Sequence, residues 1–136
     1  MPPTLRLEIV TPSAIAYEQD VEMVTLPAAD GQIGVYPQHV PLLTRIVPGE
    51  IIVRHEGRDE VLAVGEGLVE ITGNHIAIAT DMAIAAEDIN EAAVLAARQR
   101  AEARLREKIS AEEVATVNAS LARSLAQLRV KHRRRT

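Results

Sequence analysis

Aromatic side chains are nearly absent from this sequence, which has two tyrosines, no phenylalanine and no tryptophan. It therefore lacks the stacking platform that single-stranded nucleic acids need. Cysteine is also absent, which excludes disulfides and thiolate metal sites and is typical of a reducing compartment. No apolar run approaches the roughly 20 residues needed to span a bilayer, and the N-terminus does not resemble an export signal. We therefore expect any membrane association to come through partner proteins.

Side chains that carry catalysis or hold metals are present, but they form no recognisable arrangement. The histidines at 39, 55, 75 and 132 include no pair at the short spacings typical of zinc ligands. Gly65-Glu66-Gly67 alone is not a dinucleotide-binding fingerprint, and neither a phosphate-binding glycine loop nor a nucleophile elbow occurs. We interpret this glycine pair as tight packing between strands, and His39 as a loop or interface residue. The sequence predicts no catalytic site, no metal and no enzyme activity.

Charge divides the chain into two parts. Residues 1–87 carry 13 Asp and Glu against 4 Arg, and residues 88–136 carry 6 against 11 Arg and Lys, so the net charges are −9 and +5. The second part ends in a basic run, Lys131–Arg135. Such a run can bind phosphate through counterion release, but the acidic remainder would repel a nucleic acid. The run is then either a solvated end or a docking element for an acidic protein surface. We predict two domains, residues 1–87 and 88–136, and no nucleic-acid binding.

Residues 1–87 show the two-residue period of half-buried β-strands. Leu5, Leu7 and Ile9 alternate with polar residues. Further apolar runs flank Glu56–Asp59 and the dipeptide Gly73-Asn74, which is a hairpin-turn signal. Short strands at intervals of about ten residues indicate a β-sandwich or flattened barrel. We also expect the prolines at 37 and 41 to hold Tyr36–Pro41 as a rigid loop.

Residues 88–136 change to a helical period. Asp88 with Glu91 predicts a capping box at the start of a first helix, and Ser110 with Glu113 predicts a second. One face of the first helix is mostly alanine: Ile89, Ala92, Ala93, Ala96, Ala97 and Leu105. The second helix has an apolar stripe at Val114, Val117, Leu121, Leu125 and Leu128. The pattern predicts an αα-hairpin. Because a buried alanine methyl contributes only roughly 0.8 kcal/mol, we expect the hairpin to dock weakly and to move.

The most specific pattern in the chain is GQIGVYPQHVPLLT, at Gly31–Thr44. It resembles the signature of the epsilon subunit of the rotary, proton-translocating ATP synthase, called delta in mitochondria, and matches every fixed position of that signature. The similarity continues through the glycine-rich stretch Val64–Ile71 to LAQLRV at Leu125–Val130, so it covers nearly the whole chain in order. The resemblance implies an all-β sandwich of about ten strands followed by a C-terminal αα-hairpin.

The resemblance also implies partners. In that family the sandwich lies on the central rotor against the gamma subunit and the ring of c subunits. The helices either fold on the sandwich or extend along gamma into the catalytic alpha/beta head. The matching residues of the sandwich here are Thr11, Asp30, Gly31, Gln32, Tyr36, His39 and Pro41. The Asp30–Gln32 turn corresponds to the c-ring contact, with Gln32 where some members have glutamate, and Thr11 and His39 fall near gamma. Arg123 and Arg129 are the candidate contacts with an acidic segment of the head.

Some bacterial members bind ATP at the start of the first helix, through a motif of Ile or Leu, Asp, two free positions, Arg and Ala. The corresponding residues here are Ile89, Asn90, Glu91, Ala92, Ala93 and Val94. The aspartate, the arginine and the alanine of the motif are all replaced, and only Arg100 matches a position that can assist phosphate. We therefore expect weak or absent ATP binding and no other cofactor.

These observations predict a non-catalytic rotor subunit that couples proton-driven rotation to ATP synthesis and restrains ATP hydrolysis through its hairpin. The resemblance implies a peripheral position at the cytoplasmic face of a bacterial plasma membrane, held by the complex, rather than at a plastid thylakoid. The alternative that the residues alone leave open is a free-standing β-sandwich that binds a ligand or a protein. Co-purification with gamma and the catalytic head distinguishes the two.

Overall fold

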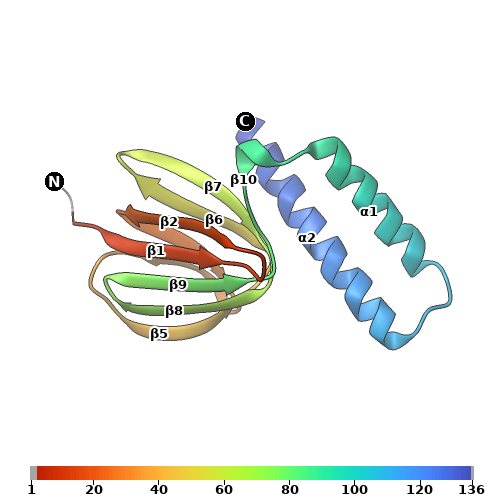
Figure 1. The fold of residues 1–136 in the computed structure, drawn as a ribbon, viewed down its shortest axis with the longest axis horizontal. Coiled ribbons are helices and arrows are strands. Elements are labelled where there is room, and N and C mark those ends of the chain that lie inside the picture. Colours follow the sequence, from red (N-terminus) through yellow and green to blue (C-terminus); the bar gives the residue numbers. More distant parts are fainter. Residues whose placement is uncertain (1–2, 136) are drawn as a thin grey trace.

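The computed structural model describes residues 3–135, in which ten strands form a sandwich and two antiparallel helices lie beside it (Figure 1). The strands are β1 (Leu5–Val10), β2 (Ile15–Val21), β3 (Met23–Ala28), β4 (Gly31–Val35), β5 (His39–Ile46), β6 (Gly49–His55), β7 (Arg58–Val64), β8 (Gly67–Gly73), β9 (His75–Thr80) and β10 (Ala83–Ala85). They are followed by the 3₁₀ turn η1 (Ala86–Asp88) and the helices α1 (Glu91–Leu105) and α2 (Ala111–Arg135). The predicted fold class is confirmed.

The strands form two layers that meet at a corner. Hydrogen-bonded neighbours follow the order β10-β7-β6-β3-β5-β8-β9-β1-β2, and β4 pairs with β3. At the corner, β3 and β5 pair only through Ala28 and Ile46. We call β5-β8-β9-β1-β2 the first sheet and β10-β7-β6-β3-β4 the second sheet. Strands β1 and β9 run parallel, and the other pairings among the described strands are antiparallel.

The core fills the space between the two sheets with aliphatic side chains. The predicted alternation in β1 is confirmed, because Leu5, Leu7 and Ile9 are all buried in this core. Gly65 and Gly67 confirm the interpretation as tight packing. A Cβ at Gly67 would lie 2.0 Å from the carbonyl oxygen of Ala79.

Two predicted turns differ in length from the structure. The β6–β7 turn is only Glu56 and Gly57, at φ 52° and 74°, because His55 already pairs with Arg58. The predicted loop Tyr36–Pro41 is also shorter, since β5 begins at His39. The prediction failed there because β5 accommodates Pro41 at a register irregularity between His39 and Leu42, where a strand tolerates proline.

The predicted start of the first helix was wrong. Asp88 ends η1 instead, and Asn90 caps α1 by accepting a hydrogen bond from the Ala93 amide at 3.0 Å. Asn and Asp are nearly equal as caps, and the 3₁₀ turn decides between them. The predicted capping box of the second helix is confirmed for the Ser110 side chain, because the Glu113 amide donates a hydrogen bond to Ser110 Oγ at 3.2 Å. The predicted basic run continues α2 as helix through Arg135.

The hairpin docks through α2, which packs on β6, β7 and η1, while α1 packs chiefly on α2. The docking contact is a second apolar cluster: Ala63, Ala86, Ile89, Val94, Leu128 and Val130. The predicted alanine face of α1 was therefore partly wrong. Ala92 and Ala93 are exposed, and Val94 and Ala101 are buried instead. The error arose because Ile89 precedes α1, so its burial does not indicate which face of the helix meets α2.

Candidate interaction surfaces

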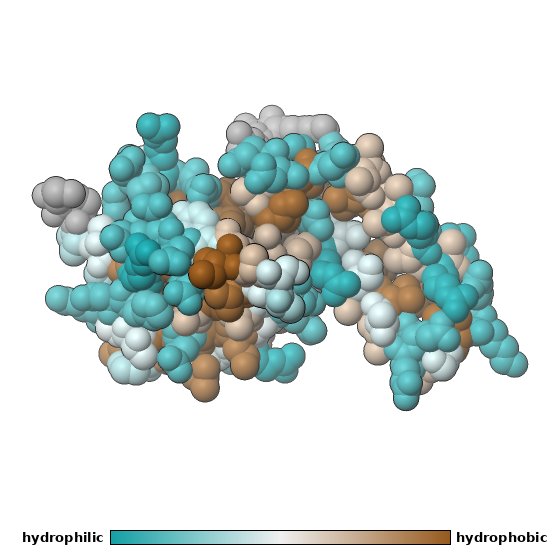
Figure 2. Space-filling view, in the orientation of Figure 1, coloured by the Kyte–Doolittle hydropathy of each residue, from teal (hydrophilic) through white to brown (hydrophobic). Residues whose placement is uncertain are grey.

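The outer face of the first sheet carries a row of apolar side chains that crosses four strands. Leu68 pairs with Ala79, Ala79 pairs with Val10, and Val10 pairs with Ile15. We call these four residues the apolar row. Leu68 is 53% exposed and Ile15 is 60% exposed, although aliphatic side chains of this size are usually buried. In Figure 2 a hydrophobic patch lies over the ends of β1 and β9 that point toward the helices. A contiguous exposed apolar patch with a polar rim is typical of a protein interface.

Beside the apolar row lies a second row that is acidic. Glu8 pairs directly with Glu18, and both Glu8 and Glu70 pair with Ala77. Like charges directly opposite each other destabilise a sheet, and Arg6 offsets this repulsion. Arg6 forms ion pairs with Glu18 at 2.5 Å and with Asp20 at 3.3 Å. These two carboxylates raise the pKa of the Arg6 guanidinium.

A residue from a different hairpin holds part of the signature segment, Gly31–Thr44, in place. Gln38 has a positive φ of 66°, and its amide donates to Asn74 Oδ1 at 2.8 Å. The Asn74 carbonyl in turn accepts from the Arg6 amide at 2.7 Å. Asn74 thus joins the start of β5 to the β8–β9 turn and to β1. Sequence reasoning identified Asn74 only as a turn residue, because its partners are distant in the chain. Tyr36 and Val40, on either side of Gln38, are exposed.

The predicted partner residues of the sandwich do not form one surface. His39 pairs with Gly73 at one end of the first sheet. Thr11 follows Val10 at the opposite end, where its hydroxyl donates to the Ala14 carbonyl at 3.3 Å. Gly73 lies five positions after Leu68 on β8, which corresponds to roughly 17 Å along the strand. Thr11 therefore adjoins the apolar row, and His39 lies with Tyr36 and Pro41 at the far end.

The turn predicted to meet the c-ring lies beside α2. Gly31 and Gln32 line a hollow of about 280 Å³ together with Glu50 and Arg129. Asp30 precedes Gly31, whose φ of 128° is in the region that favours glycine. The structure thus brings together Gln32 and Arg129, two residues that the resemblance assigned to different partners. The proximity could not be read from the sequence, because it depends on where α2 docks.

Ion pairs connect α2 to the sandwich at Arg123 and at Arg133. Arg123 Nη1 lies 3.1 Å from Asp81 Oδ2, and Arg133 Nη1 lies 2.7 Å from Glu50 Oε1. A third polar contact joins the helices, between His132 Nε2 and Glu91 Oε1 at 3.1 Å. At the outer end of the hairpin, Arg104 bridges Glu107 and Glu113. These two carboxylates, Glu113 first, raise the pKa of Arg104.

The degenerate ATP motif contributes to the docking cluster. Ile89 and Val94 are 4% and 7% exposed and pack with Leu128 and Val130. Asn90 uses its side-chain oxygen to cap α1, while Ala93 supplies the capped amide. Arg100 is exposed on α1. Three positions of the degenerate motif, Ile89, Asn90 and Val94, are therefore engaged in the cluster and the cap.

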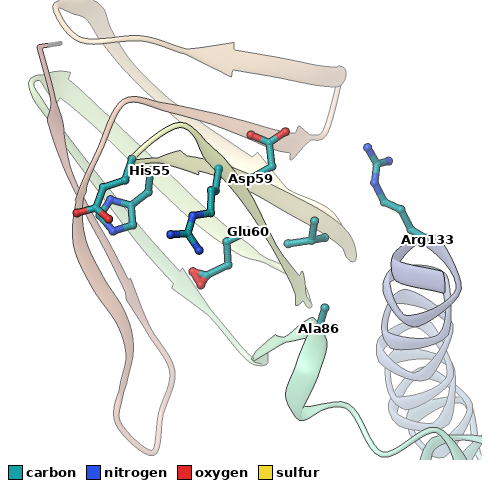
Figure 3. A pocket seen from close by; sticks show the side chains of 8 residues that line it. His55, Asp59, Glu60, Ala86 and Arg133 are labelled. Atoms are coloured by element: carbon teal, nitrogen blue, oxygen red, sulfur yellow. The ribbon is translucent and has the colours of Figure 1, made fainter. Parts of the chain in front are cut away.

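A hollow of about 480 Å³ opens between the β6–β7 hairpin and the end of α2. Figure 3 shows Arg133 extending from α2 toward the strands, with Ala86 of η1 nearby and His55 and Glu60 on the hairpin. Both acidic and basic side chains line this hollow, so it favours neither an anionic nor a cationic ligand. Burial, together with the neighbouring Glu60 carboxylate, raises the pKa of Tyr17.

Within residues 3–135, no group of three or more His, Asp and Glu side chains is arranged to hold a metal ion. None of the helices that the structure describes combines the length and the apolar character needed to cross a bilayer.

Comparison with known families covers nearly the whole chain. A model described as ATP synthase, Delta/Epsilon chain, beta-sandwich domain matches residues 4–86. A second, described as ATP synthase, Delta/Epsilon chain, long alpha-helix domain, matches residues 87–132. The fold is also similar to a chain of the Euglena gracilis mitochondrial ATP synthase, with a TM-score of 0.77, 19% identity, and coverage of 95% of this chain and 81% of that one. A chain of the Tetrahymena thermophila enzyme gives a TM-score of 0.58 at 12% identity and coverages of 96% and 98%.

Curated relatives give the same result at higher identity. The ATP synthase epsilon chain of Halorhodospira halophila is 41% identical over 128 residues, which is 93% of this chain and 91% of the relative. That of Nitrosococcus oceani is 38% identical over 127 residues, with coverages of 93% and 91%. The resemblance seen at Gly31–Thr44 is confirmed, and the chain belongs to the delta/epsilon chain family of ATP synthases.

Proposed function

We propose that this chain is a non-catalytic central-stalk subunit of a proton-translocating ATP synthase, which couples rotation to ATP synthesis and restrains ATP hydrolysis through its hairpin. The observation that supports this best is the apolar row on the outer face of the first sheet. A subunit that transmits torque needs a stiff scaffold with a permanent partner surface. The buried core behind this sheet provides the stiffness, and the row provides the surface.

We assign the apolar row to the gamma subunit. Thr11, the residue that the resemblance places near gamma, directly follows Val10 of the row. The acidic row beside it favours a partner with basic side chains at its rim. The Tetrahymena structure that shares this fold is of a central stalk and c-ring, which supports a contact between the ring and the exposed Asp30–Gln32 turn. The complex then holds the chain at the cytoplasmic face of a bacterial plasma membrane.

The hairpin is assigned to regulation rather than to nucleotide binding. Val94, which replaces the alanine of the ATP-binding motif, is buried, and Asn90, which replaces its aspartate, is engaged as a helix cap. We therefore propose that the docked state of the hairpin does not depend on ATP. Arg123 and Arg129 lie on α2 and become contacts with the alpha/beta head when α2 leaves the sandwich.

Replacing Leu68 with aspartate is expected to abolish co-purification of this chain with gamma. The substitution places a carboxylate in the assigned interface where the partner meets an apolar side chain, which costs at least about 2 kcal/mol of binding free energy, or about thirtyfold in Kd. Pull-down from the reconstituted complex measures the effect.

Thr72→Asp is the matched control, because Thr72 lies on the same strand and face but pairs with His75 at the polar end. Circular dichroism checks that both variants remain folded. The assignment is wrong if folded Leu68→Asp assembles as well as the Thr72→Asp control.

A further inference from the structure

Asp81 and Glu50 are the carboxylates through which the sandwich binds the arginines of α2. Asp81 follows β9 and lies 3.1 Å from Arg123, while Glu50 is in β6 and lies 2.7 Å from Arg133. The two arginines are ten residues apart on α2, which corresponds to about 15 Å. The two pairs therefore hold α2 at separate points along its length.

We propose that Asp81 competes with the acidic surface of the catalytic head for Arg123, and that Glu50, through Arg133, adds to the stability of the same docked state. This inference rests on the proposed inhibitory role of the hairpin. The guanidinium of Arg123 cannot accompany α2 into the head while it pairs with Asp81, so docking on the sandwich and contact with the head are mutually exclusive. A group that binds only one of two states shifts the population toward that state. The two sandwich carboxylates thus set how often the hairpin is free to inhibit.

The position of Asp81 is fixed by the surrounding backbone. Its amide donates to the Glu66 carbonyl at 3.1 Å, and the preceding Thr80 hydroxyl donates to the same carbonyl at 2.9 Å. Its carboxylate lies over Gly65, where a Cβ would approach Asp81 Oδ1 to 1.8 Å. The absence of a side chain at Gly65 therefore leaves the space in which Asp81 meets Arg123.

The Glu50 carboxylate has fewer hydrogen-bond partners than its two oxygens could accept. Its side chain is only 14% exposed, and its Oε2 is buried without a hydrogen-bond partner within the described residues. A buried acceptor that lacks a partner weakens the state that buries it. The Asp81 and Arg123 side chains are 39% and 33% exposed, and exposed ion pairs are individually weak. The contacts therefore bias the docking equilibrium without locking it, as a competition between two surfaces requires.

The docking half of the inference is tested on the full-length chain by thiol labelling. The chain has no cysteine, so Ala63→Cys introduces a single reactive group. Ala63 is fully buried on β7 in the cluster with Leu128 and Val130. Its labelling rate, divided by the rate of the same thiol in the matching chain that lacks residues 88–136, therefore reports how often α2 leaves, even when the undocked state is rare. The division is needed because Glu50 pairs directly with position 63 and its charge affects the reactivity of the thiol.

Asp81→Asn and Glu50→Gln keep the side-chain shapes and remove the charges. Each is expected to raise the labelling rate by about two- to fivefold, and the double variant by about the product of the two. Asp20→Asn is the matched control, because Asp20 pairs with Arg6 at 3.3 Å on the first sheet, where α2 does not dock. It is expected to leave the rate unchanged. An unchanged rate in the double variant overturns the inference.

The competition itself is tested in the assembled complex. The double variant is expected to hydrolyse ATP more slowly than wild type, because more hairpins are free to inhibit. The exchange Asp81→Arg with Arg123→Asp is expected to restore slow labelling and to weaken inhibition, since the arginine is then on the sandwich.

The reference for ATP hydrolysis is a complex in which this chain lacks residues 88–136. If that deletion raises hydrolysis but the double variant labels faster without hydrolysing more slowly, the competition is wrong and the proposed function stands. If the deletion itself leaves hydrolysis unchanged, the inhibitory role is wrong.

Discussion

Removing residues 88–136 is expected to leave a folded sandwich and to raise ATP hydrolysis by the assembled complex several-fold. The main core lies between the two sheets and includes no residue of the hairpin. The deletion exposes the sandwich side of the smaller docking cluster, which is Ala63, Ala86 and the partly buried Val61, Met82 and Ile84. Each of these loses only part of the roughly 1.5–3 kcal/mol that a fully buried large aliphatic contributes. The sandwich should therefore stay folded and keep its partner surface.

Hydrolysis and assembly are measured on complexes reconstituted with the truncated and the full-length chain. Equal recovery of both chains with gamma is the control, because a chain that fails to assemble would also change activity. A complex that assembles fully and hydrolyses ATP no faster than the full-length form would contradict the assigned role of the hairpin.

Gly67→Ala is expected to destabilise the sandwich severely. The added Cβ would lie 2.0 Å from the Ala79 carbonyl oxygen and 2.9 Å from the Thr80 Cα. These are backbone atoms of the paired strand β9, so no side-chain rotation can relieve the overlap. We expect a cost of about 4 kcal/mol or more, which is a large fraction of the roughly 5–15 kcal/mol that stabilises a typical domain.

Gly57→Ala is the comparison that separates steric overlap from loss of glycine itself. A Cβ at Gly57 has nothing within 4 Å, although its φ is 74°. It should cost about 1–2 kcal/mol, from the left-handed backbone alone. Urea unfolding followed by circular dichroism measures both variants. Similar stabilities for the two would show that strand β9 moves to accommodate the methyl group.

The sandwich was predictable because its local signals agree with one another. The alternation of Leu5, Leu7 and Ile9 and the turn at Gly73-Asn74 each depend on neighbouring residues only. The helix start was missed because Asp88 and Asn90 are equally good caps, and η1 selects the second. Local pattern therefore determined the type of each element better than its boundary.

The interaction surfaces were less predictable because they depend on pairing between distant residues. Val10, Ile15, Leu68 and Ala79 are scattered through the sequence, and only the strand register aligns them. Arg123 was identified from the resemblance, but its partner Asp81 is 42 residues away and carries no sequence signal. The expectation that the hairpin docks weakly, because its first helix offers mostly alanine, was also incomplete. Leu128 and Val130 anchor the end of α2, so the freedom of the hairpin is concentrated at its outer end.

Native-state hydrogen exchange on the full-length chain tests the central claim most directly, which is that a stiff sandwich carries a loosely held arm. Amides of β1, β8 and β9 should exchange most slowly, because they lie in the pairings that close the main core. Amides of α1 and of the first half of α2 should exchange at least about a hundredfold faster. Protection of α1 equal to that of β8 and β9 would contradict the account.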